Sequence, residues 1–317
     1  MPLRLVMMGT GTFAVPTFKR LFESEHEVVG LFTQPDRTGR GHHLHVNPLK
    51  ETALEHGIPV FQPQSAKTPE AISDLKGCNA DLCVVAAYGQ ILSAELLAVP
   101  RLGAINLHGS LLPKYRGAAP VQYAVWNGEA ETGVTIFQIE PKLDAGAMLG
   151  VVKTPIGRKE TSGELMQRLG DLSVDVTLEV INKLANGSAA PIEQNTAEVT
   201  LSPMLKKTDG LIDWSQSATR IECQIRAMQP WPKAYTYLKR AHSDKSQRFI
   251  VLDADPVDRS SARPAGSILQ ADTKTVIVQC GAGSLELKSI QPEGKRALKV
   301  AEYQCGQAIT ADDSFGE

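Results

Sequence analysis

The stretch that decides the fold lies at residues 3–16 and reads Leu3-Arg4-Leu5-Val6-Met7-Met8-Gly9-Thr10-Gly11-Thr12-Phe13-Ala14-Val15-Pro16. The apolar run over residues 3–8 predicts a buried strand, and the glycines after it predict a tight turn into a helix. Pro16 is compatible with that helix because proline is tolerated in the first helical turn. We expect the helix to extend through Leu21 and Phe22. A strand followed directly by a helix is the repeating unit of an α/β sheet.

The same alternation continues to about residue 185. Apolar runs that predict strands lie at residues 28–33, 82–87, 104–107, 134–139 and 148–152, with helical stretches between several of them. Nearly continuous apolar strands that alternate with helices are typical of a parallel sheet covered on both faces. We therefore expect an α/β, Rossmann-like, mostly parallel sheet with helices on both faces. Ligand sites of such sheets lie at the carboxyl ends of the strands.

A second kind of pattern follows the α/β region. Residues 186–203 are small and polar, include two prolines and show no period, which indicates a linker. One helical stretch is expected at residues 218–227, and short β-like runs lie at residues 234–238, 249–253, 266–269, 275–280 and 284–290. Such runs predict a small β-barrel or sandwich. The expected organisation is an α/β domain over residues 1–187, a linker over 188–205 and a β-barrel domain over 206–317.

Composition limits the classes of protein. The 317 residues are 42% hydrophobic and 21% charged, which argues against a disordered, fibrous or membrane protein. The formal net charge of −2 gives no global sign of nucleic-acid binding, although it allows a local basic patch. The five scattered cysteines include no CxxC pair, so they indicate neither a disulfide framework nor a zinc site. With no signal sequence and no apolar run long enough to span a bilayer, we expect a cytoplasmic protein without a membrane partner.

The turn after the first strand also offers a dinucleotide interpretation. Residues 9–14 match the pattern G-x-G-x-x-A, and Asp36 lies past the second strand, where a ribose-binding carboxylate would be found. However, glycine is favoured at any strand-to-helix turn of such a sheet. Asp36 is also preceded by Gln34-Pro35 and followed by a long polar loop, which is unlike a ribose site. An NAD-dependent dehydrogenase is therefore kept only as a distant alternative.

The most informative stretch is GAINLHGSLLPKYRGAAP at residues 103–120. Asn106 and His108 are two residues apart at the end of an apolar strand, so their side chains project from the same face at the carboxyl edge of the sheet. An amide donor beside an imidazole can stabilise a developing oxyanion, and histidine titrates near physiological pH. An isolated pair of this kind is more often a capping asparagine and a surface histidine than an oxyanion site. The Ser-Leu-Leu-Pro turn that follows at once needs a further explanation.

Residues 106–120, with SLLPKYRGAAP, resemble the folate-dependent formyltransferases. Other segments similar to that family are the opening turn at residues 9–16, the loop TQPDRTGRG at 33–41 and LDAG at 143–146. LKK at 205–207, IDW at 212–214 and IRAMQPWP at 225–232 resemble the carboxyl-terminal domain of the methionyl-tRNA formyltransferases. The resemblance covers essentially the whole chain in order, which makes it more specific than any single motif. It also implies that the carboxyl-terminal domain is a small OB-like β-barrel.

The resemblance implies transfer of the formyl group of 10-formyltetrahydrofolate, as cosubstrate, to the α-amino group of methionyl initiator tRNA, for initiation of translation and without a metal. Asn106 and His108 would stabilise the oxyanion, and Asp144 would orient His108 or accept a proton. The implied folate-binding residues are Ser110, Leu111, Leu112 and Pro113, with Tyr88, Gly89, Gln90, Ile91 and Leu92 as the other wall. The chain departs from the family at Ala145, where threonine is usual, and at Gly11, where relatives often have proline.

Two basic patches are the expected tRNA contacts. Residues 37–50 carry basic and histidine side chains and no acidic residue, which suits phosphate contacts. Residues 1–205 carry 17 basic and 21 acidic side chains, whereas residues 206–317 carry 16 and 14, so the carboxyl-terminal part is the more cationic. The candidate tRNA-binding residues are Arg37, Arg40, His43, Lys206 and Lys207. No carboxylate or cysteine completes a metal site with the histidines of this loop.

A formyltransferase that acts on an amino sugar or a nucleotide amine is the main alternative, because it would share Asn106, His108 and Asp144. The basic loop at residues 37–50 and the stretch at 225–232 favour tRNA as the acceptor. A non-enzymatic RNA-binding protein would not need the three polar residues. The expected partners are therefore methionyl initiator tRNA and the folate, and the expected state is a monomer.

Overall fold

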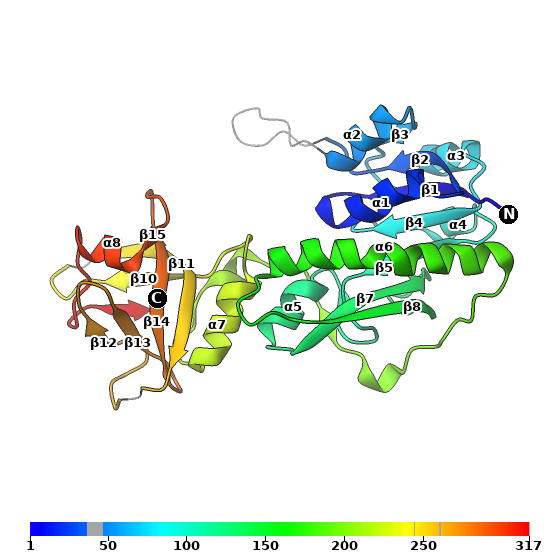
Figure 1. The fold of residues 1–317 in the computed structure, drawn as a ribbon. Helices are drawn as coiled ribbons and strands as arrows, with labels where there is room; N and C mark the ends of the chain where they lie inside the picture. The colour runs from blue at the N-terminus through cyan, green and yellow to red at the C-terminus, as the bar shows by residue number, and fades with distance from the viewer. Residues whose placement is uncertain (37–46, 244, 260, 317) are drawn as a thin grey trace. The chain divides into compact units, whose positions relative to one another are not determined.

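A computed structural model of the chain describes residues 1–36, 47–243, 245–259 and 261–316. The described part of the chain forms two compact units (Figure 1). The α/β unit comprises Met1–Pro120, Glu131–Pro155 and Met166–Pro203, and the β-barrel unit comprises Val121–Ala130, Ile156–Leu165 and Met204–Glu317. The chain passes between the units more than once, so neither unit is one continuous stretch.

The α/β unit is built on a sheet with the strand order β3-β2-β1-β4-β5-β7-β8. Its strands are β1 (Arg4–Gly9), β2 (Glu27–Phe32), β3 (Val60–Phe61), β4 (Leu82–Ala86), β5 (Ala104–His108), β7 (Glu131–Gln138) and β8 (Met148–Pro155). The strands from β3 to β5 pair in parallel, whereas β7 and β8 pair antiparallel with their neighbours. The predicted mostly parallel sheet is confirmed. Because the chain order reverses between β1 and β4, that point of the sheet is where ligands are expected.

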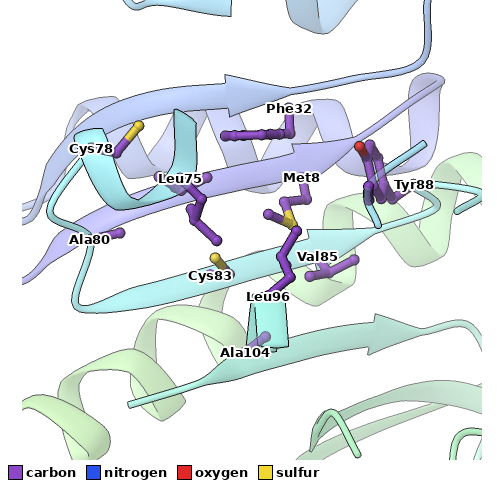
Figure 2. Packing of buried hydrophobic residues seen from close by; sticks show 12 residues of the cluster. Met8, Phe32, Leu75, Cys78, Ala80, Cys83, Val85, Tyr88, Leu96 and Ala104 are labelled. Atoms are coloured by element: carbon purple, nitrogen blue, oxygen red, sulfur yellow. The ribbon is translucent and has the colours of Figure 1, made fainter. Parts of the chain in front are cut away.

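One face of this sheet carries a core that Figure 2 shows from close by. Met8 of β1 and Val85 of β4 pack in one cluster with Leu75 of α3 (Pro69–Gly77) and Leu96 of α4 (Ala94–Leu97). Tyr88, just beyond β4, lies at one end of the cluster (Figure 2). Helices α3 and α4 therefore cover this face of the sheet.

The opposite face is buried as well. Met7 and Val84 alternate with the residues of the cluster and are no more than 1% exposed. On this side of the sheet lie α1 (Val15–Phe22) and α6 (Ser162–Asn186), which are joined by a hydrogen bond between the Thr17 and Ser173 hydroxyls at 2.9 Å. Val180 of α6 packs closely against Gly150 of β8. The expectation of helices on both faces is thus confirmed.

Capping side chains and prolines mark where several helices begin. Thr68 caps α3 because its hydroxyl accepts from the backbone N–H of Ala71, and Asn47 caps α2 (Pro48–Glu55) in the same way. Pro16 lies in the first turn of α1, as predicted. No helix within the described residues combines the length and the apolar character that crossing a membrane requires.

The β-barrel unit has the antiparallel strand order β12-β13-β14-β11-β10-β16. Its strands are β10 (Tyr235–Lys239), β11 (Ser246–Val257), β12 (Ile268–Ala271), β13 (Val276–Gln279), β14 (Ser284–Pro292), β15 (Leu298–Lys299), which pairs with β14, and β16 (Ser314–Gly316). A bridge between Ser267 and Ser314 joins the two ends of that order and nearly closes the barrel. Helix α7 (Ala218–Ala227) has the predicted bounds, and α8 (Val300–Gln304) follows β15. The predicted small β-barrel is confirmed.

The polar segment before the barrel unit has a structure that its composition did not predict. Within it, the helical turn η2 (Thr196–Glu198) precedes β9 (Leu201–Ser202). β9 pairs in parallel with β6 (Arg116–Gly117), which belongs to the turn after β5. The segment is therefore bound to the α/β unit at the edge where β5 ends.

Candidate functional site

Strand β5 places the two predicted polar residues at the carboxyl edge of the sheet. Asn106 pairs with Phe137 of β7 and with Val85 of β4, and His108 pairs with Thr135 of β7. Since residues two apart in a strand share a face, both side chains lie on the same side of β5. Asn106 is half-buried, and His108 is only 5% exposed.

His108 has a defined arrangement of its two ring nitrogens. Its Nε2 lies 2.8 Å from the carbonyl oxygen of Tyr115. Because a carbonyl can only accept, Nε2 carries the hydrogen, and in the neutral ring Nδ1 is left with a lone pair. Nδ1 lies 3.8 Å from Oδ2 of Asp144. The predicted proximity of His108 and Asp144 is thus present in the structure.

Burial lowers the pKa of His108 below its ordinary value. The carboxylate of Asp144 and the hydrogen bond to the Tyr115 carbonyl act in the opposite direction but do not outweigh the burial. His108 is therefore neutral at neutral pH. In that form its only N–H is used by Tyr115, and the nitrogen that remains available is an acceptor.

Asp144 lies in the loop between β7 and β8 with a φ of 43°, a left-handed conformation that is uncommon outside glycine. Its Oδ2 accepts a hydrogen bond from the backbone N–H of Gly117 at 2.7 Å. Residue 146 has to be glycine, because a Cβ there would lie 1.8 Å from the carbonyl oxygen of Gln138. The LDAG sequence thus provides a tight turn that directs a carboxylate at His108.

The Ser-Leu-Leu-Pro turn is held by its own polar groups. The Ser110 hydroxyl donates to the carbonyl oxygen of Lys114 at 2.7 Å, and the Thr135 hydroxyl donates to that of Ser110 at 2.7 Å. The N–H of Leu112 donates in turn to the Thr135 hydroxyl, and the Leu112–Pro113 peptide is cis. Ser110, Leu112 and Pro113 are buried, and Leu111 is half-buried. The Ser110 hydroxyl therefore shapes the turn.

Residues 88–92, predicted to form the other side of the folate site, differ in burial and in their contacts. The side-chain amide of Gln90 donates a hydrogen bond to the carbonyl oxygen of Pro63 and accepts one from the N–H of Ala66. Leu92 packs against the core cluster. Ile91 is 73% exposed. Tyr88 is 2% exposed, its hydroxyl has no partner among the described residues, and burial raises its pKa to about 12. Only part of this stretch presents groups to a ligand.

A cavity of about 470 Å³ lies at the point where the strand order reverses. It is lined by Thr10 and Gly11 after β1, Gln34 to Asp36 after β2, Asn47 and Pro48 before and at the start of α2, and Ala87 to Gly89 after β4. Sequence reasoning named Tyr88 and Gly89 but missed Thr10, Gln34 and Asn47. The available signal was their position just after predicted strands or at a helix start.

Comparison with known proteins shows which family the chain belongs to. A family model described as "Formyl transferase" matches residues 3–181, and one described as "Formyl transferase, C-terminal domain" matches residues 204–308. The methionyl-tRNA formyltransferase of Pseudoalteromonas translucida is 43% identical over 100% of this chain and 98% of its own length. The chain belongs to the methionyl-tRNA formyltransferase family. The relative from Hydrogenovibrio crunogenus, with the same name, is 40% identical over 98% of this chain and 97% of its own length.

The fold is shared more widely than this family. The N-formyltransferase from Helicobacter canadensis, solved in complex with folinic acid and dTDP-3-aminofucose, has a TM-score of 0.64. The match covers 90% of this chain and 98% of that one, at 17% identity. At such low identity the likeness shows a common fold and does not carry over the acceptor.

The residues that the formyltransferase resemblance assigns to tRNA are only partly described. Arg37, Arg40 and His43 lie outside the described residues. Lys206 and Lys207 are exposed at the start of the helical turn η3 (Lys207–Gly210). No group of three potential metal ligands occurs within the described ranges.

Asp36, the residue on which the dinucleotide alternative depends, is already engaged. Its carboxylate lies 2.5 Å from Nζ of Lys50 and accepts a further hydrogen bond from Gln62 at 3.0 Å. The hydrogen bond from Lys50 lowers the pKa of Asp36. A ribose hydroxyl would therefore have to compete with an existing ion pair.

Proposed function

We propose that this chain transfers the formyl group of 10-formyltetrahydrofolate to the α-amino group of methionyl initiator tRNA, with Asn106, His108 and Asp144 as its catalytic residues. The observation that carries the proposal is the convergence of these three side chains at the carboxyl edge of β5, in a chain that belongs to the methionyl-tRNA formyltransferase family. Nothing in the reaction requires redox chemistry, so the same groups that bind and move protons are sufficient.

Asn106 is proposed to stabilise the oxyanion. The neutral amine attacks the formyl carbon, a C–N bond forms, and the carbonyl oxygen gains negative charge. The Asn106 amide can donate a hydrogen bond to that oxygen from the edge of β5. Removal of one such donor costs about 10²–10³ in kcat in comparable sites.

Asp144 and His108 are proposed to manage the proton. The attacking amine must lose a proton, and the folate nitrogen must gain one when its bond to the formyl carbon breaks. The Asp144 carboxylate accepts the first proton, directly or through one water. Because Nδ1 of neutral His108 is an acceptor, it can take that proton from Asp144, and the imidazolium then stabilises the oxyanion. When the oxyanion collapses to the new amide, the C–N bond to the folate breaks and the proton passes to the folate nitrogen, which leaves Asp144 ionised and His108 neutral again.

The binding of both substrates is proposed around this centre. The turn at Ser110 to Pro113 and the exposed Ile91 would meet the folate, while the basic residues Lys206 and Lys207 would meet tRNA phosphates. The cavity is lined by residues that follow β1, β2 and β4, and β4 pairs with β5, so the cavity lies along the same carboxyl edge of the sheet as the polar residues of β5. Action as a monomer and a cytoplasmic location stay predictions.

A formylation assay tests the proposal directly. Purified protein with 10-formyltetrahydrofolate is given charged initiator tRNA, charged elongator tRNA or a dTDP-linked amino sugar. We expect formyl-methionyl initiator tRNA as the main product. Preferential formylation of the amino sugar would replace the proposed acceptor, and binding of a nicotinamide dinucleotide with no formylation of any acceptor would overturn the reaction class.

A further inference from the structure

The segment at residues 192–202 makes its most specific contact through Gln194, which is 7% exposed. Its Nε2 donates to the carbonyl oxygen of Asp144 at 2.9 Å and to that of Gly146 at 2.8 Å. Its Oε1 accepts from Nε of Arg116 at 3.1 Å and from Nη2 at 2.7 Å. Both donors and both acceptor positions of one amide are therefore used.

The orientation of this amide follows from the chemistry of its partners. The Arg116 guanidinium can only donate, and the two carbonyl oxygens can only accept. A carboxylate in place of the amide would suit Arg116, but it would bring an oxygen against the carbonyls of Asp144 and Gly146. Among side chains of this length only glutamine satisfies both sides at once.

The loop that Gln194 holds is one that needs support. Asp144 has a φ of 43°, and left-handed backbone at a non-glycine residue is strained and persists only where its surroundings hold it. The Gly117 N–H secures the Asp144 carboxylate, and Gln194 secures its carbonyl on the other side of the same residue. The two contacts together fix where the carboxylate lies relative to His108.

The same segment also reaches the other member of the pair. The Ser202 hydroxyl donates at 2.8 Å to the Tyr115 carbonyl, which is the acceptor of His108 Nε2. The Tyr115 N–H donates to the Thr200 hydroxyl at 2.8 Å. The acceptor that sets the tautomer of His108 is thus itself held by the 192–202 segment.

We infer that Gln194 is a positioning residue for formyl transfer, acting by holding the Asp144 loop so that the carboxylate faces Nδ1 of His108. Gln194 touches no reacting atom and works through Asp144. The inference rests on the proposed function for its kinetic consequence, whereas the geometric consequence can be measured in the free protein.

The deciding variant is Gln194→Met, which keeps the length and removes every hydrogen bond. Glu193→Met is the matched control, because Glu193 is its exposed neighbour in the same segment. In the free protein, NMR titration of the His108 ring is expected to show a lower pKa in Gln194→Met than in the wild type, because the Asp144 carboxylate that raises it has moved away. The control should titrate like the wild type.

Formylation assays supply the kinetic readout. For Gln194→Met we expect kcat to fall roughly 10–100-fold, with KM for both substrates changed less than threefold. This loss is smaller than the roughly 10²–10⁴-fold that a general acid or base contributes, because the Asp144 carboxylate is displaced and not removed. A wild-type titration of His108 combined with wild-type kcat would overturn the inference. So would a loss confined to KM, which would indicate a binding role. If the wild-type protein formylates no acceptor, the proposed function fails, and the titration still tests Gln194.

A second variant guards against poor folding, since Gln194→Met leaves the Arg116 charge buried without its acceptor. Gln194→Glu keeps an oxygen for Arg116 but replaces the donor to Asp144 and Gly146 with an oxygen that repels their carbonyls. Its melting temperature should fall less than that of Gln194→Met, because the Arg116 charge stays paired, while kcat falls at least as far as in Gln194→Met. Full activity in a folded Gln194→Glu protein would contradict the inference, because the contact to the Asp144 loop would then be dispensable.

Discussion

Gly117 donates its backbone N–H to Oδ2 of Asp144 at 2.7 Å, and this bond joins the turn after β5 to the loop between β7 and β8. Gly117 has a φ of 124°, and a Cβ there would lie 2.6 Å from the carbonyl oxygen of Ser202. The residue that presents the N–H must therefore be glycine. Two sequence motifs that are well separated along the chain thus meet at one carboxylate oxygen.

Because Asp144 accepts this hydrogen bond, two substitutions can test separately the effect of its negative charge and the effect of its hydrogen bond to Gly117. Asp144→Asn retains an oxygen that accepts from Gly117 but cannot accept a proton, whereas Asp144→Ala loses both. We expect kcat to fall by about 10²–10⁴ in both variants, since a positioned acid or base contributes that much. Only Asp144→Ala should also lose stability, by about 1 kcal/mol in chemical denaturation, because the half-buried N–H of Gly117 loses its acceptor. An Asp144→Asn protein with more than a tenth of wild-type kcat would argue against the proton-accepting role.

Asn106 gives a second kinetic prediction. Asn106→Ala removes the proposed oxyanion donor, so kcat should fall by about 10²–10³ while KM for the folate changes little. Steady-state kinetics at saturating tRNA, together with a melting curve, would measure this. A variant whose loss appears only in KM would assign Asn106 to substrate binding.

Much of the fold follows from local patterns, whereas the support of the site does not. The apolar runs and the Gly9-to-Gly11 turn predict the α/β sheet because burial on both faces and a strand-to-helix turn leave direct traces in composition. An apolar run carries no direction, so the antiparallel pairing of β7 and β8 could not be derived from it. Gln194 left no local signal at all, since its partners lie 48 to 78 residues away in the sequence.

The lowered pKa of His108 makes stability depend on pH. In the unfolded chain this histidine titrates near 6.5, and in the folded protein it titrates lower, so the unfolded state binds more protons between those two values. Stability should therefore fall as the pH drops from about 7 toward the folded-state pKa and then level off. The wild type should lose more unfolding free energy over this interval than His108→Asn, when both are measured in denaturant at pH 7 and pH 5. Parallel losses in the two proteins would show that other groups cause the dependence.

Lys206 and Lys207 lie at the start of the Met204–Glu317 part of the β-barrel unit, and they allow a test of how substrate binding is divided. In the double variant Lys206→Gln, Lys207→Gln, KM for tRNA should rise, KM for the folate should not, and the slope of log affinity against log salt should decrease by up to about 2, close to one for each lost phosphate contact. Lys76→Gln, at an exposed position in α3, is the matched control. Equal effects on tRNA and folate would contradict the assignment of these lysines to tRNA.

Gly146 predicts a steric limit on the loop that carries Asp144. In Gly146→Ala the new Cβ would lie 1.8 Å from the carbonyl oxygen of Gln138, and since that atom belongs to the backbone of β7, the loop itself has to move. Overpacking of this kind costs about 1–3 kcal/mol. Because Gln194 binds the Gly146 carbonyl, the movement should also displace Asp144 and reduce kcat.

Gly77→Ala is the control for this substitution, because a Cβ at the end of α3 meets nothing within 4 Å. Alanine there should leave stability unchanged or raise it by up to about 1 kcal/mol, as is usual for glycine in a helix. Denaturation midpoints and kcat of both variants decide the matter. If Gly146→Ala matched Gly77→Ala in both quantities, the loop would tolerate displacement, and a tight fit at Gly146 could not be what holds the carboxylate toward His108.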